Sequence, residues 1–417
     1  MKICVLTHTF PRNDKDVSAA FMKEFADGLA QNGNQVTVIT PYDPKFSRKN
    51  DPFKVITYKY IWPDSLHLLG YSQTMEEDVK LRKRAYMLLP FMLLFSLITL
   101  VKVIKKERIE LISVHWILPN GLVAFIASLI TKVPYVVTLP GTDVYLASRI
   151  KPFGWVAKII ALNGAGITSN SSYLLKRLLN LGISNKPTLI ISYPADVSRF
   201  KPLEANKNQY REKFGLEVNN FVILAIGRLV YKKGFEYLIK SLPDVLRKHT
   251  NVRLLIGGDG DLKPELQKTV EKMGLQDKVI FAGTISRDEI LNVYNLADVL
   301  VAPSVIDKKG NVDGGPVVCL ESMACGKPQI VTNILGMADV VEDGVNGFIV
   351  PEKDPQALSA AIEKLVVSPK LRKEMGIKNR QLVTERLGTQ SVGKIYTDFF
   401  NDVLKNRGVK QKKLSYA

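Results

Sequence analysis

The chain has 417 residues, of which 46% are hydrophobic and 24% charged, proportions that exclude a disordered, collagen-like or coiled-coil protein. This length is enough for two or three globular domains. Lysine and arginine outnumber aspartate and glutamate by 58 to 40, which indicates acidic partners such as phosphates, nucleic acid or an anionic membrane surface.

The cysteines and the start of the chain bear on its cellular location. Cys4, Cys319 and Cys325 are odd in number and show no CxxC spacing, so neither a disulfide framework nor a zinc site is expected. No signal peptide is expected, because the apolar run over residues 3–6 stops at Thr7. Both features favour a cytoplasmic protein.

The first residues predict a strand, a helix and a second strand. Residues 2–7 form a short apolar run, and a polar loop follows through Asp16. Ser18 can cap a helix that ends near Gly33, after which residues 35–40 resume as a strand. This βαβ unit is typical of a nucleotide-binding α/β layer.

The first half also contains an apolar segment between basic clusters. Residues 85–101 carry no charge, whereas the wider segment 80–110 contains eight basic and two acidic side chains. Seventeen uncharged residues are fewer than the ~20 of a membrane-spanning helix. Two interpretations remain open: residues 82–108 and the basic tail 405–413 contact an anionic membrane surface, or the segment is a core helix with solvated ends.

The strand–loop–helix pattern restarts in the second half. Residues 221–226 predict a strand, residues 227–234 a loop, and residues 252–256 the next strand after a helix. Two such openings predict an α/β protein with two doubly wound sheets. The polar and charged residues 196–219 suggest a linker between them.

Residues 313–321, with the sequence DGGPVVCLE, form the strongest candidate binding motif. A glycine-proline helix start leaves backbone N–H groups free to bind an anion. The residues assigned to this donor site are Asp313, Gly315, Val317, Val318 and Glu321. The two carboxylates can accept hydrogen bonds from sugar or ribose hydroxyls. Taken alone, an ordinary helix start with two solvated acids explains the motif equally well.

A second motif supports the first. The loop over residues 227–234 follows the first strand of the second half and contains Arg228 and Lys233. Ligands of doubly wound sheets bind at this edge, where the two cations can bind a diphosphate. Both motifs therefore indicate one site.

Together these motifs resemble the retaining glycosyltransferases of family 4, which have the GT-B fold and use nucleotide-sugar donors. The resemblance covers nearly the whole chain and implies two Rossmann-like domains facing across a cleft. It implies that Arg228 and Lys233 bind the diphosphate of a UDP- or GDP-linked sugar, and that Asp313 and Glu321 contact the sugar and the ribose. It implies neither a metal nor another cofactor. The family usually has Glu at the position of Asp313.

The resemblance also implies a reaction site in the first half. His115, in the segment 111–121, matches the family histidine near the reacting sugar, so His115, Arg228 and Lys233 are the expected catalytic residues. The acceptor side departs from the family pattern, with Pro140-Gly141 in place of a His-Gly pair and Tyr193-Pro194 in place of an Asn-Gly turn. The residues expected there are Asp16, Ser18 and Asp143.

The expected domains follow from the motifs and the resemblance. They are an acceptor-side domain over 1–195, a linker over 196–219, a nucleotide-sugar domain over 220–385, a helix over 386–408 that packs back on the first domain, and a basic tail over 409–417. The expected activity is hexosyl transfer to a saccharide or lipid-linked acceptor hydroxyl with retention of configuration. Its setting would be cell-surface polysaccharide or glycolipid assembly, in the cytoplasm or peripherally at the inner face of the cell membrane.

Four alternatives compete with this interpretation. An Asp-x-Asp tripeptide at 14–16 or 259–261 could hold a divalent metal, but the second also suits a tight turn. A nucleic-acid-binding protein is disfavoured because the basic clusters are not interleaved with stacking aromatic residues. A non-catalytic protein that binds sugar nucleotides remains open. A nicotinamide enzyme is not expected, since neither half has GxGxxG after its first strand.

Overall fold

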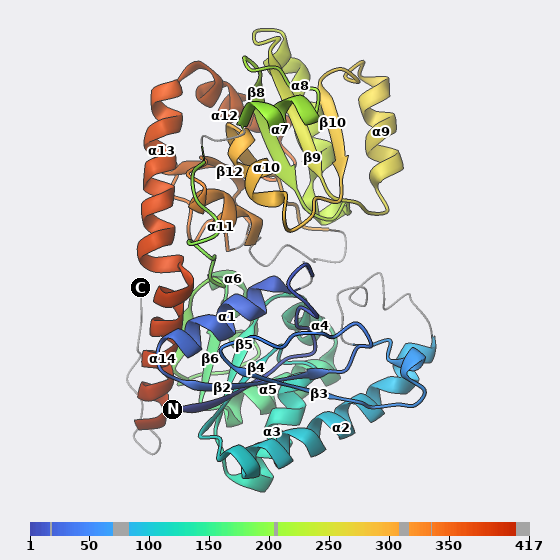
Figure 1. Cartoon of the computed structure of the whole chain (residues 1–417), viewed down its shortest axis with the longest axis vertical. Coiled ribbons are helices and arrows are strands. Elements are labelled where there is room, and N and C mark those ends of the chain that lie inside the picture. Colours follow the sequence, from blue (N-terminus) through green and yellow to red (C-terminus); the bar gives the residue numbers. More distant parts are fainter. Residues whose placement is uncertain (17–18, 70–82, 204–206, 308–316, 335, 406–417) are drawn as a thin grey trace. The chain divides into compact units, whose positions relative to one another are not determined.

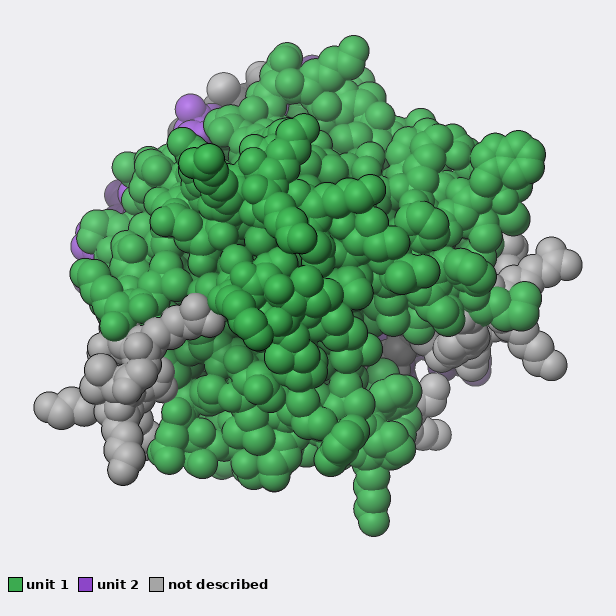
Figure 2. Space-filling model, turned by 90° about the horizontal axis from the view of Figure 1, so that it is seen from below, with its two compact units in different colours: residues 1–194, 389–417 green, residues 195–388 purple. Residues whose placement is uncertain are grey.

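The computed structural model describes the chain except for residues 17–18, 70–82, 204–206, 308–316, 335 and 406–417 (Figure 1). The chain divides into two compact units, coloured separately in Figure 2. Unit 1 contains residues 1–194 and 389–417, and unit 2 contains residues 195–388. The chain therefore leaves unit 1 once and returns to it at the start of its last helix.

Unit 1 is built on a parallel sheet of seven strands in the order β3-β2-β1-β4-β5-β6-β7. The strands are β1 (Lys2–Leu6), β2 (Gln35–Pro41), β3 (Lys54–Tyr58), β4 (Leu111–His115), β5 (Tyr135–Leu139), β6 (Gly166–Ser169) and β7 (Thr188–Ile190). The central strands β4 and β5 are buried along their whole length, as expected when helices cover both faces of a parallel sheet. The strand order reverses between β1 and β4, which is where ligands bind in such sheets.

The helices of unit 1 lie on the two faces of this sheet (Figure 1). They are α1 (Ala20–Gln31), α2 (Lys83–Glu107), α3 (Asn120–Thr131), α4 (Thr142–Arg149), α5 (Lys151–Asn163), α6 (Ser172–Leu179) and α14 (Thr389–Lys405). Helices α2 and α3 pack side by side on one face, and α1 packs against α14.

Two glycines bring α1 and α14 into backbone contact. A methyl group on Gly28 would lie 2.3 Å from the carbonyl oxygen of Thr389, and one on Gly393 would lie 2.1 Å from the carbonyl oxygen of Gly28. Only residues without a Cβ allow the two helices to approach this closely. Helix α14 is thereby fixed to α1.

Unit 2 repeats the architecture with a parallel sheet of six strands in the order β10-β9-β8-β11-β12-β13. The strands are β8 (Phe221–Ile226), β9 (Val252–Gly257), β10 (Val279–Gly283), β11 (Val299–Ala302), β12 (Gln329–Thr332) and β13 (Gly347–Val350). Its order reverses between β8 and β11, so the loops after these two strands flank its switch point. The two doubly wound α/β sheets predicted from the sequence are confirmed.

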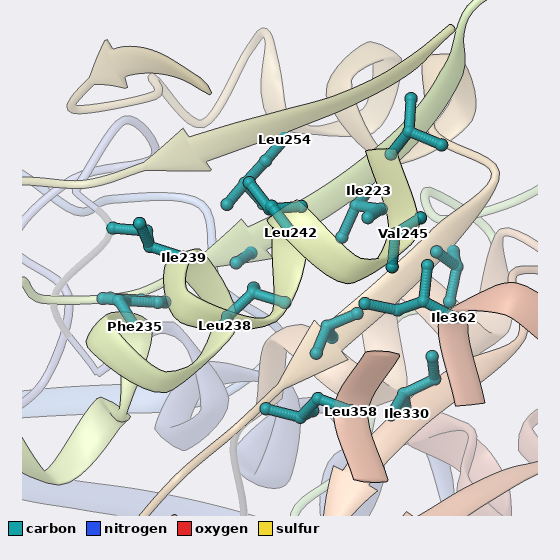
Figure 3. Close-up of a cluster of buried hydrophobic side chains, with 14 of the residues drawn as sticks. Ile223, Phe235, Leu238, Ile239, Leu242, Val245, Leu254, Ile330, Leu358 and Ile362 are labelled. Carbon is teal, nitrogen blue, oxygen red and sulfur yellow. The ribbon is translucent and has the colours of Figure 1, made fainter. Parts of the chain in front are cut away.

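The helices of unit 2 are α7 (Lys207–Lys213), α8 (Phe235–Leu246), α9 (Lys263–Lys272), α10 (Ile290–Leu296), α11 (Val317–Ala324), α12 (Pro355–Val367) and α13 (Pro369–Leu382). Several of them, with α8 and α12 foremost, bury apolar faces against its sheet. In the core shown in Figure 3, Leu238 and Leu242 of α8 lie with Ile223 of β8 and Leu254 of β9. The buried residues of α8, among them Phe235, Leu238, Leu242 and Val245, recur every three to four residues, the spacing of an amphipathic helix.

The segment suggested as a linker is part of unit 2. It contains α7, and Arg211 in this helix is buried. The guanidinium donates to the carbonyl oxygen of Leu296 at 3.0 Å and to Oδ2 of Asp298 at 3.0 Å. Helix α7 of this segment is therefore held within unit 2 by a charge-assisted bond to a residue far along the chain.

Candidate active site

The loop after β8 is fixed at the switch point of unit 2 by glycines. A methyl group on Gly258 would lie 1.9 Å from the carbonyl oxygen of Gly227, and one on Gly234 would lie 1.9 Å from that of Pro303. Gly234 also has a φ of +67°, which residues with a side chain rarely adopt. The loop after β8 therefore packs directly on the segments that follow β9 and β11.

A backbone hydrogen bond adds to this junction. The N–H of Val305 donates to the carbonyl oxygen of Lys232 at 2.9 Å. Since β11 leads through this segment toward α11, the loop with Arg228 and Lys233 and the start of α11 follow two neighbouring strands of one parallel sheet. Asp313 and Gly315 lie outside the described residues, whereas Val317 and Val318 form the partly exposed first turn of α11.

The two predicted cations differ in their surroundings. Arg228 is exposed at the start of the loop. Lys233 is partly buried, and a methyl group on Gly227 would lie 2.9 Å from its Cε atom, so its side chain lies along the glycine backbone. The edge of the sheet thus carries one exposed and one sheltered positive charge, an arrangement suited to an anion.

Glu321 lies one turn into α11 and is held by a tyrosine. The hydroxyl of Tyr294, in α10, donates to its Oε2 atom at 2.6 Å. Burial raises the pKa of Glu321 to about 7, although this hydrogen bond and the nearby Arg287 and Arg199 act in the opposite direction. The carboxylate is therefore oriented by the protein and changes charge near neutral pH.

The sequence did not indicate Tyr294 or Arg199 as parts of this site. Tyr294 is 27 residues from Glu321, and Arg199 lies in the segment suggested as a linker. Arg199 donates to the carbonyl oxygen of Arg287, which brings both cations near the carboxylate. Neither residue belongs to a recognisable motif, so only the folded chain reveals these contacts.

His115 ends β4 at the switch point of unit 1. Its Nδ1 atom lies 2.7 Å from the hydroxyl of Tyr193, and its ring packs edge-on against Phe25. The imidazole is fully buried, at 0% exposure, and burial together with the nearby His8 lowers its pKa to about 3. A neutral ring without exposed surface cannot touch a substrate until a neighbouring side chain moves, so its catalytic role stays a prediction.

Asp143 lies beside this histidine strand, in the first turn of α4. It is buried, and its Oδ2 atom accepts a 2.5 Å hydrogen bond from the backbone N–H of Ile117. Burial nevertheless raises its pKa to about 7. The carboxyl therefore joins the loop after β4 to α4, and its predicted acceptor contact is untested.

Asp16 is also engaged within unit 1. Its Oδ2 atom accepts from the Nε of Arg12 at 2.6 Å and from the backbone N–H of the same residue at 3.1 Å. The carboxylate thereby orders the loop after β1. Strand β1 is one of the two strands at the switch point of unit 1. Ser18 lies outside the described residues.

The described part of the chain contains no group of three or more His, Cys, Asp or Glu side chains arranged to hold a metal ion. At the second Asp-x-Asp tripeptide, Oδ1 of Asp259 accepts from the N–H of Gly260 at 2.8 Å, and Oδ2 lies 3.4 Å from Nζ of Lys263. This aspartate therefore caps a turn.

Comparison with known proteins adds family information. The sequence matches the model of "Glycosyl transferases group 1" over residues 206–382 and that of "Glycosyltransferase Family 4" over residues 18–199. It is 25% identical to an uncharacterized glycosyltransferase of Methanocaldococcus jannaschii, over 88% of this chain and 89% of that protein. It is 29% identical to the capsular polysaccharide biosynthesis glycosyltransferase CapM of Staphylococcus aureus, over 68% and 75%.

A solved structure supports the same fold. The chain is similar to HepE of Anabaena, determined in complex with UDP, with a TM-score of 0.74 and 20% sequence identity. The similarity covers 96% of this chain and 100% of that one. The expected GT-B fold is confirmed.

Proposed function

We propose that this chain, a glycosyltransferase of family 4 with the GT-B fold, transfers a hexosyl unit from a nucleotide-diphosphate sugar to an acceptor hydroxyl with retention of configuration. The observation that carries the proposal is the junction in unit 2, where the loop containing Arg228 and Lys233 packs on the segment leading to α11. The proposed donor is a UDP- or GDP-linked sugar. The UDP complex of HepE makes UDP the first to test.

Each part of the donor has a proposed partner in unit 2. Arg228 and Lys233 bind the diphosphate together with the first N–H groups of α11, at Val317 and Val318. Glu321, oriented by Tyr294, accepts hydrogen bonds from the ribose hydroxyls. Asp313 and Gly315 complete this site in the proposal, Asp313 as the partner of the sugar.

These groups also define a catalytic role. When the bond to the sugar breaks, negative charge develops on the leaving nucleoside diphosphate. Fixed cations and N–H groups stabilise that charge without reorganising. We therefore propose that Arg228 and Lys233 supply the positive charge for departure and that turnover needs no divalent metal.

Unit 1 is proposed to bind the acceptor. His115 ends β4, Asp16 lies in the loop after β1, and Asp143 lies in the first turn of α4 and accepts a hydrogen bond from the loop after β4. The relatives and the basic composition favour a saccharide or lipid-linked acceptor in cell-surface polysaccharide or glycolipid assembly. A cytoplasmic location agrees with Cys4, Cys319 and Cys325, which are buried and form no disulfide.

A transfer assay tests the proposal. The enzyme is incubated in EDTA with UDP-glucose, UDP-galactose, UDP-N-acetylglucosamine or GDP-mannose and a panel of saccharide and lipid-linked acceptors. Acceptor-dependent release of the nucleoside diphosphate is expected with one donor. NMR of the glycosylated acceptor, recorded early in the reaction, should show the same anomeric configuration as the donor. Inversion would contradict the retaining mechanism, and binding of a donor without turnover would favour the non-catalytic alternative.

A further inference from the structure

Helix α2 has one face inside unit 1 and an opposite face that is apolar and exposed. Met92, Leu100 and Val103 are buried, and the helix packs on β2 and α3. The opposite face carries large apolar side chains that we call the outer stripe. Its residues are Met87, Phe91, Leu94, Phe95 and Ile98, with exposures of 69, 50, 51, 40 and 38%.

Basic side chains follow the outer stripe on the same face of α2. The spacing of three and four residues that joins Leu94 to Ile98 leads on to Lys102 and Lys105, which are exposed. Lys106 and Arg108 beside them are also exposed. From Met87 onward the outward face is therefore apolar over about three turns and basic at the end of the helix, as in helices that lie on anionic membranes.

We propose that the outer stripe and the lysines after it dock unit 1 on an anionic lipid surface. The apolar side chains would enter the boundary between headgroups and acyl chains, and the lysines would remain at the level of the anionic headgroups. A lipid surface is favoured over a soluble protein partner because one face offers both a row of apolar side chains and a cluster of cations. The inference does not depend on the donor site.

The packing of α2 argues for docking and against spanning. Met87–Glu107 is the one helix in the described ranges that is long and apolar enough to cross a membrane by length and composition. Leu100, however, is fully buried, and Ile104 and Met92 are nearly so. Surrounding the helix with lipid would strip these residues from the sheet, whereas docking leaves their packing intact.

The direction of α2 relates this surface to the predicted acceptor residues. The helix ends shortly before β4 begins, so it runs antiparallel to the strands of the sheet. The outer stripe therefore lies toward the carboxyl ends of the strands, the edge at which β4 finishes at His115. A lipid-anchored acceptor would approach unit 1 at that edge.

Vesicle flotation of the full-length protein without nucleotide tests the proposal. Binding is expected to vesicles of 30% phosphatidylglycerol in phosphatidylcholine, with much weaker binding to pure phosphatidylcholine and release in 0.5 M salt. Leu94→Asp with Ile98→Asp should abolish binding. Lys102→Gln with Lys105→Gln should weaken it ~25-fold, or roughly fivefold per lysine.

Matched substitutions in unit 2 provide the controls. Val367 and Ile377 are 61 and 57% exposed on α12 and α13, and Lys373 and Lys378 are exposed on α13. The same Asp and Gln changes there should leave binding unchanged. Thermal unfolding of every variant shows whether it folds.

A labelled cysteine gives a second measurement that needs no loss of binding. Because Cys4, Cys319 and Cys325 are buried, a dye should react selectively at Leu94→Cys. An environment-sensitive dye there should shift to the blue on anionic vesicles, and the same dye at Val367→Cys should not. Three outcomes would each overturn the proposal. The Leu94→Asp, Ile98→Asp variant could bind as well as the wild type, the wild type could fail to bind anionic vesicles at low salt, or its binding could resist extraction by salt and carbonate.

Discussion

The hydroxyl of Tyr294 donates a 2.6 Å hydrogen bond to Glu321 and so joins α10 to α11 beside the proposed donor site. The bond orients a carboxylate that the sequence identified and lowers its pKa against the effect of burial. One oxygen of Glu321 is thereby committed to the protein, and in the proposed donor site the carboxylate also accepts from a ribose hydroxyl.

Replacing Tyr294 with Phe should weaken the binding of a sugar nucleotide roughly fivefold, the effect of one hydrogen bond of about 1 kcal/mol. The pKa of Glu321 should also rise, because the bond favours its charged form. Isothermal titration calorimetry across pH measures both effects. Tyr173→Phe, which removes a hydroxyl of unit 1 bonded to Arg177, is the control and should bind normally. Unchanged affinity and pH dependence in Tyr294→Phe would argue against a positioning role.

Donor affinity should depend on pH through Glu321. Its pKa is raised to about 7, and only the ionised carboxylate accepts two hydroxyl hydrogen bonds, so affinity should fall as the pH drops below 7, up to about tenfold per unit. A sugar nucleotide is the correct probe, since its doubly esterified diphosphate does not titrate in this range. Glu321→Gln should bind weakly with a flat profile; a slope that survives in Glu321→Gln would assign the titration to another group.

Removing either cation of the loop after β8 should reduce turnover while the protein still folds. A charge-assisted hydrogen bond contributes on the order of 1.5–3 kcal/mol, so Arg228→Ala or Lys233→Ala should lower kcat/KM about 10- to 150-fold. The control is Lys240→Ala in α8, whose amine pairs with Glu236 at the surface. Steady-state kinetics and far-UV circular dichroism distinguish a chemical defect from unfolding. Normal kinetics in both Arg228→Ala and Lys233→Ala would contradict the proposed diphosphate site.

Asp143 should make the protein less stable as the pH rises. Its pKa is raised from 3.8 to about 7 in the folded protein, so between these values the folded state binds more protons than the unfolded state. Linkage then requires the free energy of unfolding to fall across this window, on the order of 2 kcal/mol between pH 5 and 8. Asp143→Asn keeps an acceptor for Ile117 and should lose this contribution. Thermal unfolding of both proteins tests the sign: a parallel pH dependence would show that Asp143 does not titrate there.

Gly28→Ala should destabilise unit 1, although alanine normally favours a helix interior. The added methyl group would lie 2.3 Å from the carbonyl oxygen of Thr389 and force α1 away from α14. Overpacking of this kind costs about 1–3 kcal/mol, measurable by chemical denaturation. A gain in stability would mean that the two helices are not in backbone contact.

Local patterns of the sequence were enough to predict both sheets and the loop after β8, which carries part of the proposed site. Residues 221–226 and 227–234 show the apolar run and the glycines that form β8 and its loop, and these signals lie within a few residues of one another. The contacts that complete the site join residues far apart in the chain. Nothing near Tyr294 predicts its bond to Glu321, and nothing near Asp143 predicts its bond to Ile117.

Burial was the other property that the sequence did not provide. The pattern around His115 places it at the end of a strand, as the structure shows, but not beneath Phe25 and Tyr193 with no exposed surface. The apolar run over 85–101 likewise left open whether it lay in the core. In α2 the run contributes to the core and to the surface, because one face packs on the sheet while the outer stripe remains exposed.

The most direct test of the central claim, a diphosphate site built by Arg228 and Lys233 in unit 2, is a thermal-shift titration with UDP, GDP and ADP in EDTA. A ligand that binds only the folded protein raises its stability by mass action, by about 2.7 kcal/mol at a hundred times its Kd. The wild type should shift with one nucleotide, and Arg228→Ala should not. An equal shift in Arg228→Ala, or no shift with any nucleotide or its sugars, would contradict the account.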